Sequence, residues 1–349
     1  MPEFKIKNRA IGTGQPCYVI AEMSANHGGS FEKAMAMVRS AKEAGADAIK
    51  LQTYTPDTMT IDCNNEYFHI DHPLWKDKTL YQLYKQAQTP WEWHKPLKED
   101  AERIGLHFFS TPFDETAVDF LETLDVPAYK IASFELVDDP LLKKVAQTGK
   151  PVIMSTGMAS LQEIRHAVDV LRGHGTKNLA LLHCVSAYPA KPQEMNLAQI
   201  MDMRRQFDVV TGLSDHTTDS VSSIAAVALG ANIIEKHFKS SDTDQSPDAA
   251  FSLSSGQLHR LVNDIRLAES SIGQASYGPA ASEKGSLKFR RSLFFVKEMR
   301  QGDVVTAENI RVIRPGHGLA PKEIGKVLGK RLKKAVGRGE PVTWGIIDE

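Results

Sequence analysis

"IIEKHF", residues 233–238, begins like a strand made for a protein core and then changes character. Ile233 and Ile234 suit the inside of a sheet, but Glu235, Lys236 and His237 follow with no turn residue between them. Charged side chains are rarely buried unless they are paired. The order of residues in the rest of the chain explains why a buried strand ends in three ionisable groups.

Seven other apolar runs precede this one, and amphipathic helical patterns separate most of them. The eight runs are 17–23, 48–54, 107–113, 128–134, 151–157, 179–185, 209–216 and 232–238, and helical spacing marks 31–46, 161–173, 220–231 and 256–273. Alternation of strand and helix predicts a parallel sheet with both faces covered, and eight repeats in about 250 residues predict a (β/α)8 TIM barrel. A doubly wound open sheet is the alternative, but no G-x-G-x-x-G motif follows the first run.

Polar residues gather at the carboxyl-terminal ends of these runs. In a barrel those ends converge on one rim, where active sites lie. Glu235, Lys236 and His237 are therefore expected at the rim rather than in the core. The other members of the group are Glu22, Lys50, Gln52, Ser110, Lys130, Ser133, Glu135, Ser155, His183, Ser214, Asp215 and His216.

The pattern changes near residue 276. A linker is expected over 276–285, between a barrel domain over 1–275 and a small β-rich domain over 286–349, where short strands and turns replace long helices. Residues 283–349 hold 15 Lys and Arg against 8 Asp and Glu, a net charge of +7, while the remainder nets −8. A basic module that docks on an acidic body explains this better than nucleic-acid binding, because aromatic residues are not interleaved with the basic ones.

The 349-residue chain has the composition of a soluble globular protein, 42% hydrophobic and 24% charged with a net charge of −1. Cys17, Cys63 and Cys184 are an odd number and lie far apart, which suits a reducing compartment. The first residues lack the apolar core of a signal peptide, and no run approaches the roughly 20 apolar residues of a membrane span. We expect a cytoplasmic protein without membrane or nucleic-acid partners, in which Cys184 is a core residue.

His216 and His237 end neighbouring strands, seven and eight. Neutral imidazole is a common metal ligand, and adjacent strands lie about 5 Å apart, so the two rings could share one ion. Asp215 or Glu235 could orient them. The alternative is two structural histidines with satisfied hydrogen bonds.

Lys50 and Lys130 end strands two and four. With Ser133, Ser155 and Ser214 they would bind a small anion such as a phosphate next to a carboxylate. Glu22 and Glu135 could bind sugar hydroxyls or transfer protons. The alternative for all four ionisable residues is a set of structural Lys–Glu pairs.

Two loops add weaker signals. "SANHGG", residues 24–29, could hold a phosphate through backbone amides or serve only as a helix cap. Residues 55–90 form a long connection rich in aromatic and acidic residues, which we interpret as a substrate-covering loop.

Several motifs together resemble the sialic acid synthase family. They are "IAEMSANHGGS", "GADAIKLQTY", "KIASFE", "STGMAS", "GLSDHT" and "ALGANIIEKHF", and "RRSLFFVKEMRQGDVVTAENIRVIRPGHG" is similar to the antifreeze-like (SAF) domain attached to those enzymes. The resemblance implies a transferase that condenses phosphoenolpyruvate with an N-acyl amino sugar. "AEMSANH", "PLWKDKTLYQLYKQAQTPWEWH" and "AAFSL" are closer to the branch that makes pseudaminate, whereas "SPDAAFSL" keeps a Pro-Asp pair typical of the neuraminate branch.

The resemblance also implies roles for individual residues. His216 and His237 match the ligands of a divalent metal, usually Mn2+, with Mg2+ or Co2+ possible. Phosphoenolpyruvate contacts are implied for Lys50, Lys130, Ser133, Ser155, Ser186 and Ser214, and contacts with the acceptor sugar for Glu22, Gln52, Glu135, Tyr188, Asp248 and Arg314. Glu22 and Glu135 are candidates for handling water or protons. Arg314 matches an arginine that reaches the partner subunit's barrel in a domain-swapped homodimer.

The implied reaction joins phosphoenolpyruvate, 2,4-diacetamido-2,4,6-trideoxy-L-altrose and water into pseudaminate and phosphate. The alternative is N-acetylneuraminate or legionaminate synthesis from N-acetylmannosamine or 2,4-diacetamido-2,4,6-trideoxymannose. A metal-dependent aldolase and a non-catalytic sugar- or ice-binding protein are competing functions on the same barrel.

Overall fold

The computed structural model describes residues 2–72, 75–76 and 78–348. The chain divides into two compact units, Met1–Gly273 and Gln274–Glu349. The sequence placed this division at a linker over 276–285, and η6 (Ala281–Phe289) occupies part of that range. The two units are described separately.

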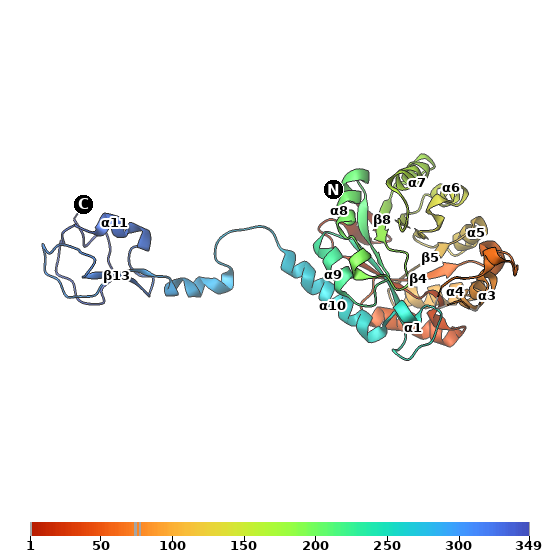
Figure 1. The fold of residues 1–349 in the computed structure, drawn as a ribbon, viewed down its shortest axis with the longest axis horizontal. Helices are drawn as coiled ribbons and strands as arrows, with labels where there is room; N and C mark the ends of the chain where they lie inside the picture. Colours follow the sequence, from red (N-terminus) through yellow and green to blue (C-terminus); the bar gives the residue numbers. More distant parts are fainter. Residues whose placement is uncertain (1, 73–74, 77, 349) are drawn as a thin grey trace. The chain divides into compact units, whose positions relative to one another are not determined.

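The first unit is a barrel of eight parallel strands surrounded by helices (Figure 1). In order around the barrel the strands are β3 (Tyr18–Glu22), β4 (Ala48–Thr53), β5 (His107–Pro112), β6 (Tyr129–Ile131), β7 (Val152–Ser155), β8 (Leu179–Cys184), β9 (Val210–Asp215) and β10 (Ile233–Lys239). Pairing of β10 with both β9 and β3 closes the circle, and β11 (Leu253–Ser254) adds to β10. The predicted (β/α)8 barrel is confirmed; seven strands lie inside the runs that predicted them, and β10 extends one residue beyond its run, to Lys239.

Helices cover the outside of the barrel and follow the strands in turn. They are α1 (Phe31–Glu43), α4 (Trp91–Arg103), α5 (Glu115–Thr123), α6 (Asp139–Gln147), α7 (Leu161–Gly173), α8 (Ala198–Phe207), α9 (Val221–Ala228) and α10 (Ser255–Ile272). Local sequence fixes several ends, because Ser30 caps α1 and Ser160 forms a capping box with Glu163 at the start of α7. Short 3-10 turns η1 (Ser24–His27), η3 (Glu135–Val137), η4 (Pro192–Glu194) and η5 (Ala249–Phe251) lie in the connections.

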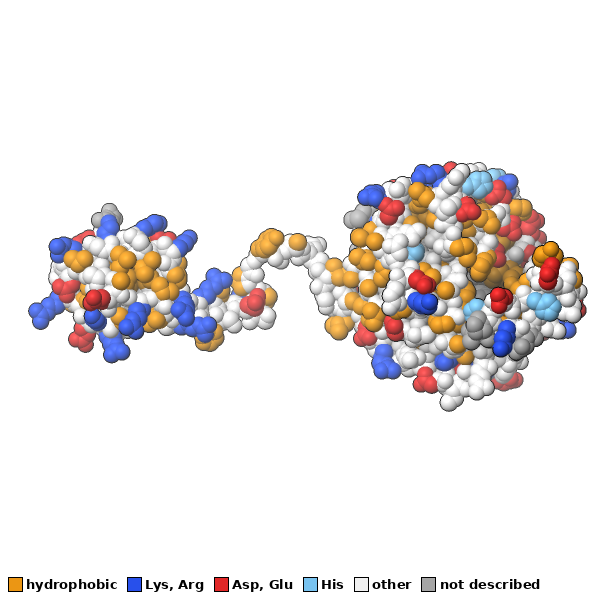
Figure 2. Space-filling view, in the orientation of Figure 1, with side chains coloured by type: hydrophobic (Ala, Val, Ile, Leu, Met, Phe, Trp, Pro, Cys, Tyr) orange, Lys and Arg blue, Asp and Glu red, His pale blue; other side chains and the backbone are white. Residues whose placement is uncertain are grey.

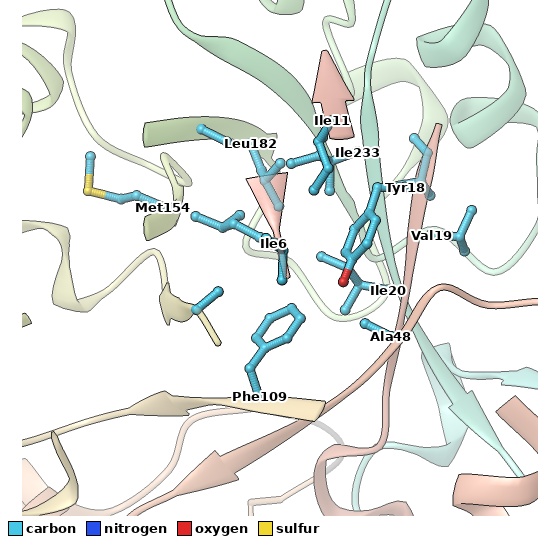
Figure 3. Close-up of a cluster of buried hydrophobic side chains, with 14 of the residues drawn as sticks. Ile6, Ile11, Tyr18, Val19, Ile20, Ala48, Phe109, Met154, Leu182 and Ile233 are labelled. Carbon is cyan, nitrogen blue, oxygen red and sulfur yellow. The ribbon is translucent and has the colours of Figure 1, made fainter. Parts of the chain in front are cut away.

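A hairpin that the sequence analysis did not predict fills the amino-terminal end of the barrel. It consists of β1 (Glu3–Ile6) and β2 (Arg9–Gly12), which pair antiparallel. Ile6 and Ile11 are fully buried among barrel side chains such as Leu182 and Ile233 (Figure 3). Apolar side chains of the hairpin therefore fill the interior of the barrel at this end.

The long connection between β4 and α4 contains its own short elements. These are α2 (Pro56–Met59), η2 (Glu66–Phe68) and α3 (Leu80–Ala87). Capping boxes begin both helices, at Thr55 and at Thr79. The segment 55–90 is hereafter called the insert.

The second unit has its own small core. Its elements are η6, the antiparallel strands β12 (Ser292–Phe295) and β13 (Ile310–Ile313), η7 (Pro321–Glu323) and α11 (Ile324–Val327). Leu293, Phe295 and Val342 are among the residues buried in that core. Many Lys and Arg side chains cover its surface (Figure 2).

No helix in the described ranges has the length and apolar character needed to cross a membrane.

Candidate active site

Strand register brings the polar residues of the rim together. His237 lies opposite Glu22, Glu22 lies opposite Lys50, and Glu235 lies opposite Ser214 on the neighbouring strands. Successive side chains of a strand point to opposite faces. Glu235 and His237 therefore face the inside of the barrel, where both line a pocket, while Lys236 faces outward.

The inner pocket is small and polar. Both lysines reach it although they are almost fully buried, with Lys50 3% and Lys130 2% exposed. The Lys130 ammonium donates to Ser155 Oγ at 2.7 Å, and that of Lys50 donates to Thr111 Oγ1 at 2.9 Å. The residues that line this pocket are Lys50, Gln52, Thr111, Lys130, Ala132, Ser133, Phe134, Ser155, Cys184, Tyr188, Ser214, His216, Glu235 and His237.

Two glutamates pair with the lysines. Lys50 Nζ lies 2.5 Å from Glu22 Oε2, and Glu235 lies between the lysines, 3.9 Å from Lys50 and 3.5 Å from Lys130. Ser214 donates to Glu235 Oε1 at 3.0 Å. The Lys–Glu pairs that the sequence left as an alternative are therefore present, in the same pocket as the serines.

Burial and neighbouring charges shift the pKa values of these lysines and glutamates. Burial raises the pKa of Glu22 to about 7, against the attraction of Lys50, so Glu22 is partly protonated there. Burial also acts on Glu235, but Lys130 and Lys50 outweigh it and lower the pKa of that carboxyl. Burial also lowers the pKa of Lys130, and an anionic ligand in this pocket would favour the ammonium forms of both lysines.

His216 and His237 lie side by side at the mouth of the inner pocket, with ring centroids 5.4 Å apart. The Nδ1–H of His216 donates to the carbonyl of Val185 at 2.9 Å, which leaves Nε2 as the basic nitrogen. Burial, followed by repulsion from His216 and Lys50, holds the pKa of His237 well below its usual range, so this ring is neutral. His237 Nδ1 is buried without a hydrogen bond, and Asp248 Oδ2 lies 4.0 Å from it.

These observations fit a divalent cation held by two imidazoles. Metal–nitrogen bonds of about 2.0–2.1 Å let two rings at this separation reach one ion. The described residues contain no cluster of three or more His, Cys, Asp or Glu that could hold a metal. A cation here would complete its coordination with substrate or water, as open catalytic sites do.

The outer pocket continues from the inner one and has a volume of about 390 Å³. Gln52, Phe134, Tyr188 and His237 line both. The Tyr188 ring lies 4.5 Å from that of His216, and Phe251 lies 5.0 Å from His237. The other lining residues are Ser24, Tyr54, Ile70, His72, Trp75, Leu80, Leu83, Tyr84, Ala87, Ser186, Pro247 and Asp248.

Three predicted residues lie outside the two linings. Glu22 contacts the inner pocket through Lys50. Glu135 stands in η3, and its Oε2 is buried without a hydrogen-bond partner, while burial raises the pKa of its carboxyl to about 7. Arg314 is exposed on the second unit. The remaining predicted site residues line one pocket or the other.

The sequence analysis misplaced two residues of β8. Cys184 is buried as expected, but it lines the inner pocket, with Sγ 3.8 Å from Ser186 Oγ and from His216 Nδ1. His183, which we grouped with the rim residues, points to the other face and bonds the Met195 carbonyl at 2.5 Å. The two side chains point to opposite faces of the strand because they are adjacent in sequence, but the sequence does not show which of them faces the inside of the barrel. Thr111 and the bridging position of Glu235 were also missed, and both follow from strand pairing that the sequence does not contain.

A buried ion pair supports the two histidines from behind. Lys236 Nζ lies 2.9 Å from Asp215 Oδ2, and both side chains are fully buried. Lys236 also donates to the Thr217 carbonyl at 2.6 Å, while Asp215 accepts from Thr217 N at 2.9 Å and from Ser223 Oγ at 2.6 Å. Each residue of the pair neighbours one histidine in sequence, so the pair joins the ends of β9 and β10.

Two known protein families match most of the chain. Residues 37–277 match the NeuB family and residues 290–346 match the SAF domain. The chain belongs to the NeuB family. The resemblance to sialic acid synthases and the expected SAF domain are both confirmed.

Relatives within the NeuB family cover nearly the whole chain. Pseudaminic acid synthase of Campylobacter jejuni is 40% identical over 330 residues, 95% of this chain and 96% of the relative. Pseudaminic acid synthase of Helicobacter pylori is 40% identical, covering 94% and 97%. N,N'-diacetyllegionaminic acid synthase of Legionella pneumophila is 36% identical, covering 95% of each chain. The crystal structure of an N-acetylneuraminic acid synthetase from Leptospira borgpetersenii in complex with citrate superposes with a TM-score of 0.73 at 32% identity, covering 82% of this chain and 96% of that one.

Proposed function

We propose that this protein condenses phosphoenolpyruvate with 2,4-diacetamido-2,4,6-trideoxy-L-altrose and water to give pseudaminate and phosphate. The observation that carries the proposal is the two-part pocket, in which a buried paired-lysine site adjoins two imidazoles and opens into a larger cavity. The relatives named pseudaminic acid synthase, at 40% identity, support this sugar over the legionaminate precursor, whose relative is 36% identical.

The inner pocket binds the donor. Lys50 and Lys130 attract its phosphate and carboxylate, the hydroxyls of Ser133 and Ser155 donate to its oxygens, and Ser214, whose hydroxyl donates to Glu235, lines the pocket beside them. Ser186 lines the outer pocket beside them. Glu235 lies between the two ammonium groups and positions them, while its single negative charge balances only one of them.

His216 and His237 hold a divalent cation, which we propose is Mn2+ with Mg2+ or Co2+ as substitutes. When bound, such an ion supplies Lewis-acid polarisation of the sugar aldehyde. The carbonyl of Val185 fixes the tautomer of His216, and the low pKa of His237 keeps that ring neutral and able to bind a cation.

The chain's carboxyl groups manage protons and water. Carbon 3 of the donor forms a bond to the aldehyde carbon, whose oxygen takes a proton, while water adds at carbon 2 and phosphate leaves. Glu22 and Glu135 both have a pKa raised to about 7 by burial, so each can give or take a proton at neutral pH. Gln52, Tyr188 and Asp248 line the outer pocket where the acceptor would lie.

A homodimer is part of the proposal. Arg314 is exposed on the second unit, whose residues 283–349 carry a net charge of +7 against −8 for the remainder. We propose that Arg314 contacts the N-acyl group of the acceptor in the partner subunit's barrel, as the sequence resemblance implies. Mixing Arg314→Ala chains with His237→Ala chains tests this, because mixed dimers regain one complete site only if the domain is exchanged.

Phosphate release with each candidate sugar tests the proposed reaction. Release with the altrose derivative, and loss of release in a folded His237→Ala variant, would support it. Activity with N-acetylmannosamine or the trideoxymannose alone would favour the neuraminate or legionaminate alternative. Reversible pyruvate chemistry without phosphate would instead indicate an aldolase, and a His237→Ala variant with unchanged function would indicate a binding protein.

A further inference from the structure

The outer pocket is lined by polar and aromatic residues of the barrel loops and by residues of the insert. Ser24, Gln52, Asp248 and His237 supply polar groups from the ends of the barrel strands and their loops. The insert contributes His72 and a mostly apolar set of Ile70, Trp75, Leu80, Leu83, Tyr84 and Ala87.

The helix α3 presents one face to the pocket. Leu80, Leu83, Tyr84 and Ala87 stand at positions i, i+3, i+4 and i+7, which form one stripe of a helix. All four line the pocket, and no residue of α3 is fully buried. The apolar stripe therefore faces a cavity instead of a protein core, and we call these four residues the α3 face.

The α3 face is held in position by specific contacts. The Thr79 and Gln82 side chains form a reciprocal capping box at its start. Tyr84 packs edge-on against Tyr54 with ring centroids 5.8 Å apart, and Trp75 Nε1 donates to the Pro247 carbonyl at 3.3 Å. The indole Nε1 of Trp91 in turn donates to the backbone carbonyl of Tyr54 at 3.1 Å. The face is thus preorganised against the barrel.

The position of His237 determines which part of an acceptor meets this face. His237 lines both pockets, so it marks their junction. Under the proposed function the donor occupies the inner pocket, and the reacting aldehyde lies at the junction. The end of the sugar remote from the aldehyde must then extend into the outer pocket towards the insert.

We propose that the α3 face is the specificity surface for the remote end of the acceptor and selects a 6-deoxy sugar. This inference rests on the proposed function and adds the reason for the sugar choice. A methyl group gains from leaving water against Leu80 and Leu83, whereas a hydroxyl group there loses its hydrogen bonds to water. An apolar surface rejects an added hydroxyl only moderately, by about 10- to 100-fold.

Two sugars that differ only at carbon 6 test the inference. The proposed 6-deoxy acceptor is compared with its 6-hydroxy counterpart, 2,4-diacetamido-2,4-dideoxy-L-altrose, by kcat/KM from phosphate release. We expect the wild-type protein to prefer the deoxy sugar about 10- to 100-fold. Leu83→Asn should reduce that preference by about tenfold, because the amide offers the hydroxyl a partner, while KM for phosphoenolpyruvate stays unchanged.

Matched variants separate specificity from folding. Ile61→Asn makes the same kind of change in the insert at a side chain that is 59% exposed and lines neither pocket, so it should leave the preference unchanged. Ala87→Ser adds a hydroxyl to the α3 face with little change of volume and replaces Leu83→Asn if that variant does not fold.

The outcomes distinguish this inference from the proposed function. Equal use of the two altrose sugars by the wild type, or an unchanged preference in folded Leu83→Asn and Ala87→Ser, would overturn the role of the α3 face while leaving the synthase intact. Phosphate release with N-acetylmannosamine alone would overturn both, because that acceptor carries a hydroxyl at carbon 6.

Discussion

Breaking the buried pair Lys236–Asp215 should destabilise the barrel far more than breaking a surface pair. The charges lie 2.9 Å apart and neither side chain is exposed. At that distance their attraction is about 6 kcal/mol for an effective dielectric constant of 20. In the Lys236→Met variant, Asp215 keeps its hydrogen bonds from Thr217 and Ser223 but loses its counter-charge. Removing one member of such a pair typically costs about 3–5 kcal/mol, so we expect a loss of that size.

Urea unfolding of the full chain measures this loss, with a Trp344→Phe background so that the fluorescence of Trp75, Trp91 and Trp93 reports the barrel alone. The control is Lys144→Met, which removes the cation of an exposed pair with Asp119 whose side chains are 32% and 65% exposed. Solvent screens that pair, so its loss should be small. A double variant Lys236→Met, Asp215→Asn should recover much of the stability, because it leaves no unpaired charge and the amide oxygen can still accept from Thr217.

The reasoning would be wrong if Lys236→Met unfolded at the same urea concentration as Lys144→Met. It would also be wrong if the double variant were as unstable as the sum of its two single changes, because the pair would then show no coupling.

Three further predictions concern the site. Burial raises the pKa of Glu135 to about 7 from 4.5, so the neutral form of this carboxyl favours folding. As the pH rises from 4.5 through 7, the unfolding free energy of the wild type should fall by up to about 3 kcal/mol relative to that of Glu135→Gln. Parallel curves of unfolding free energy against pH for the two proteins would contradict this. A Cβ at Gly157 would lie 2.4 Å from Ser133 Cβ and 2.8 Å from Ser186 Oγ at a φ of +46°. Gly157→Ala should therefore lower kcat/KM by about 100-fold in steady-state assays, and wild-type kinetics would show that the loop yields at no cost. Mn2+ at 100 times its Kd should stabilise the wild type by about 2.7 kcal/mol in thermal unfolding but not His237→Ala, and equal shifts would exclude His237 as a ligand.

Periodicity and strand ends predicted most of the architecture. Runs such as 179–185 and 232–238 became β8 and β10 because the covered start of each strand is apolar, while ionisable residues such as Glu235 and His237 come at its carboxyl-terminal end. The sequence analysis did not predict the hairpin β1–β2, because its two strands have only four residues each and give too short a pattern. Only the closed barrel creates the space that Ile6 and Ile11 fill.

The sequence predicted which residues form the site but not which of them contact one another. Ionisable residues at strand ends identified Lys50, Lys130, His216 and His237 because apolar runs leave few other places for them. The position of Glu235 between both lysines depends on the register of β10 against β9 and on the curvature of the barrel. Neither quantity is encoded in a local pattern.

The hairpin plug has a consequence for the order of events during turnover. Ile6 and Ile11 close the amino-terminal end of the barrel. In the described part of the chain, a ligand therefore reaches the inner pocket through the outer pocket, with which it shares Tyr188 and His237. A bound acceptor would block that passage. Phosphoenolpyruvate should therefore bind before the acceptor in a compulsory order. Phosphate, which is released in the deepest part of the pocket, should leave last.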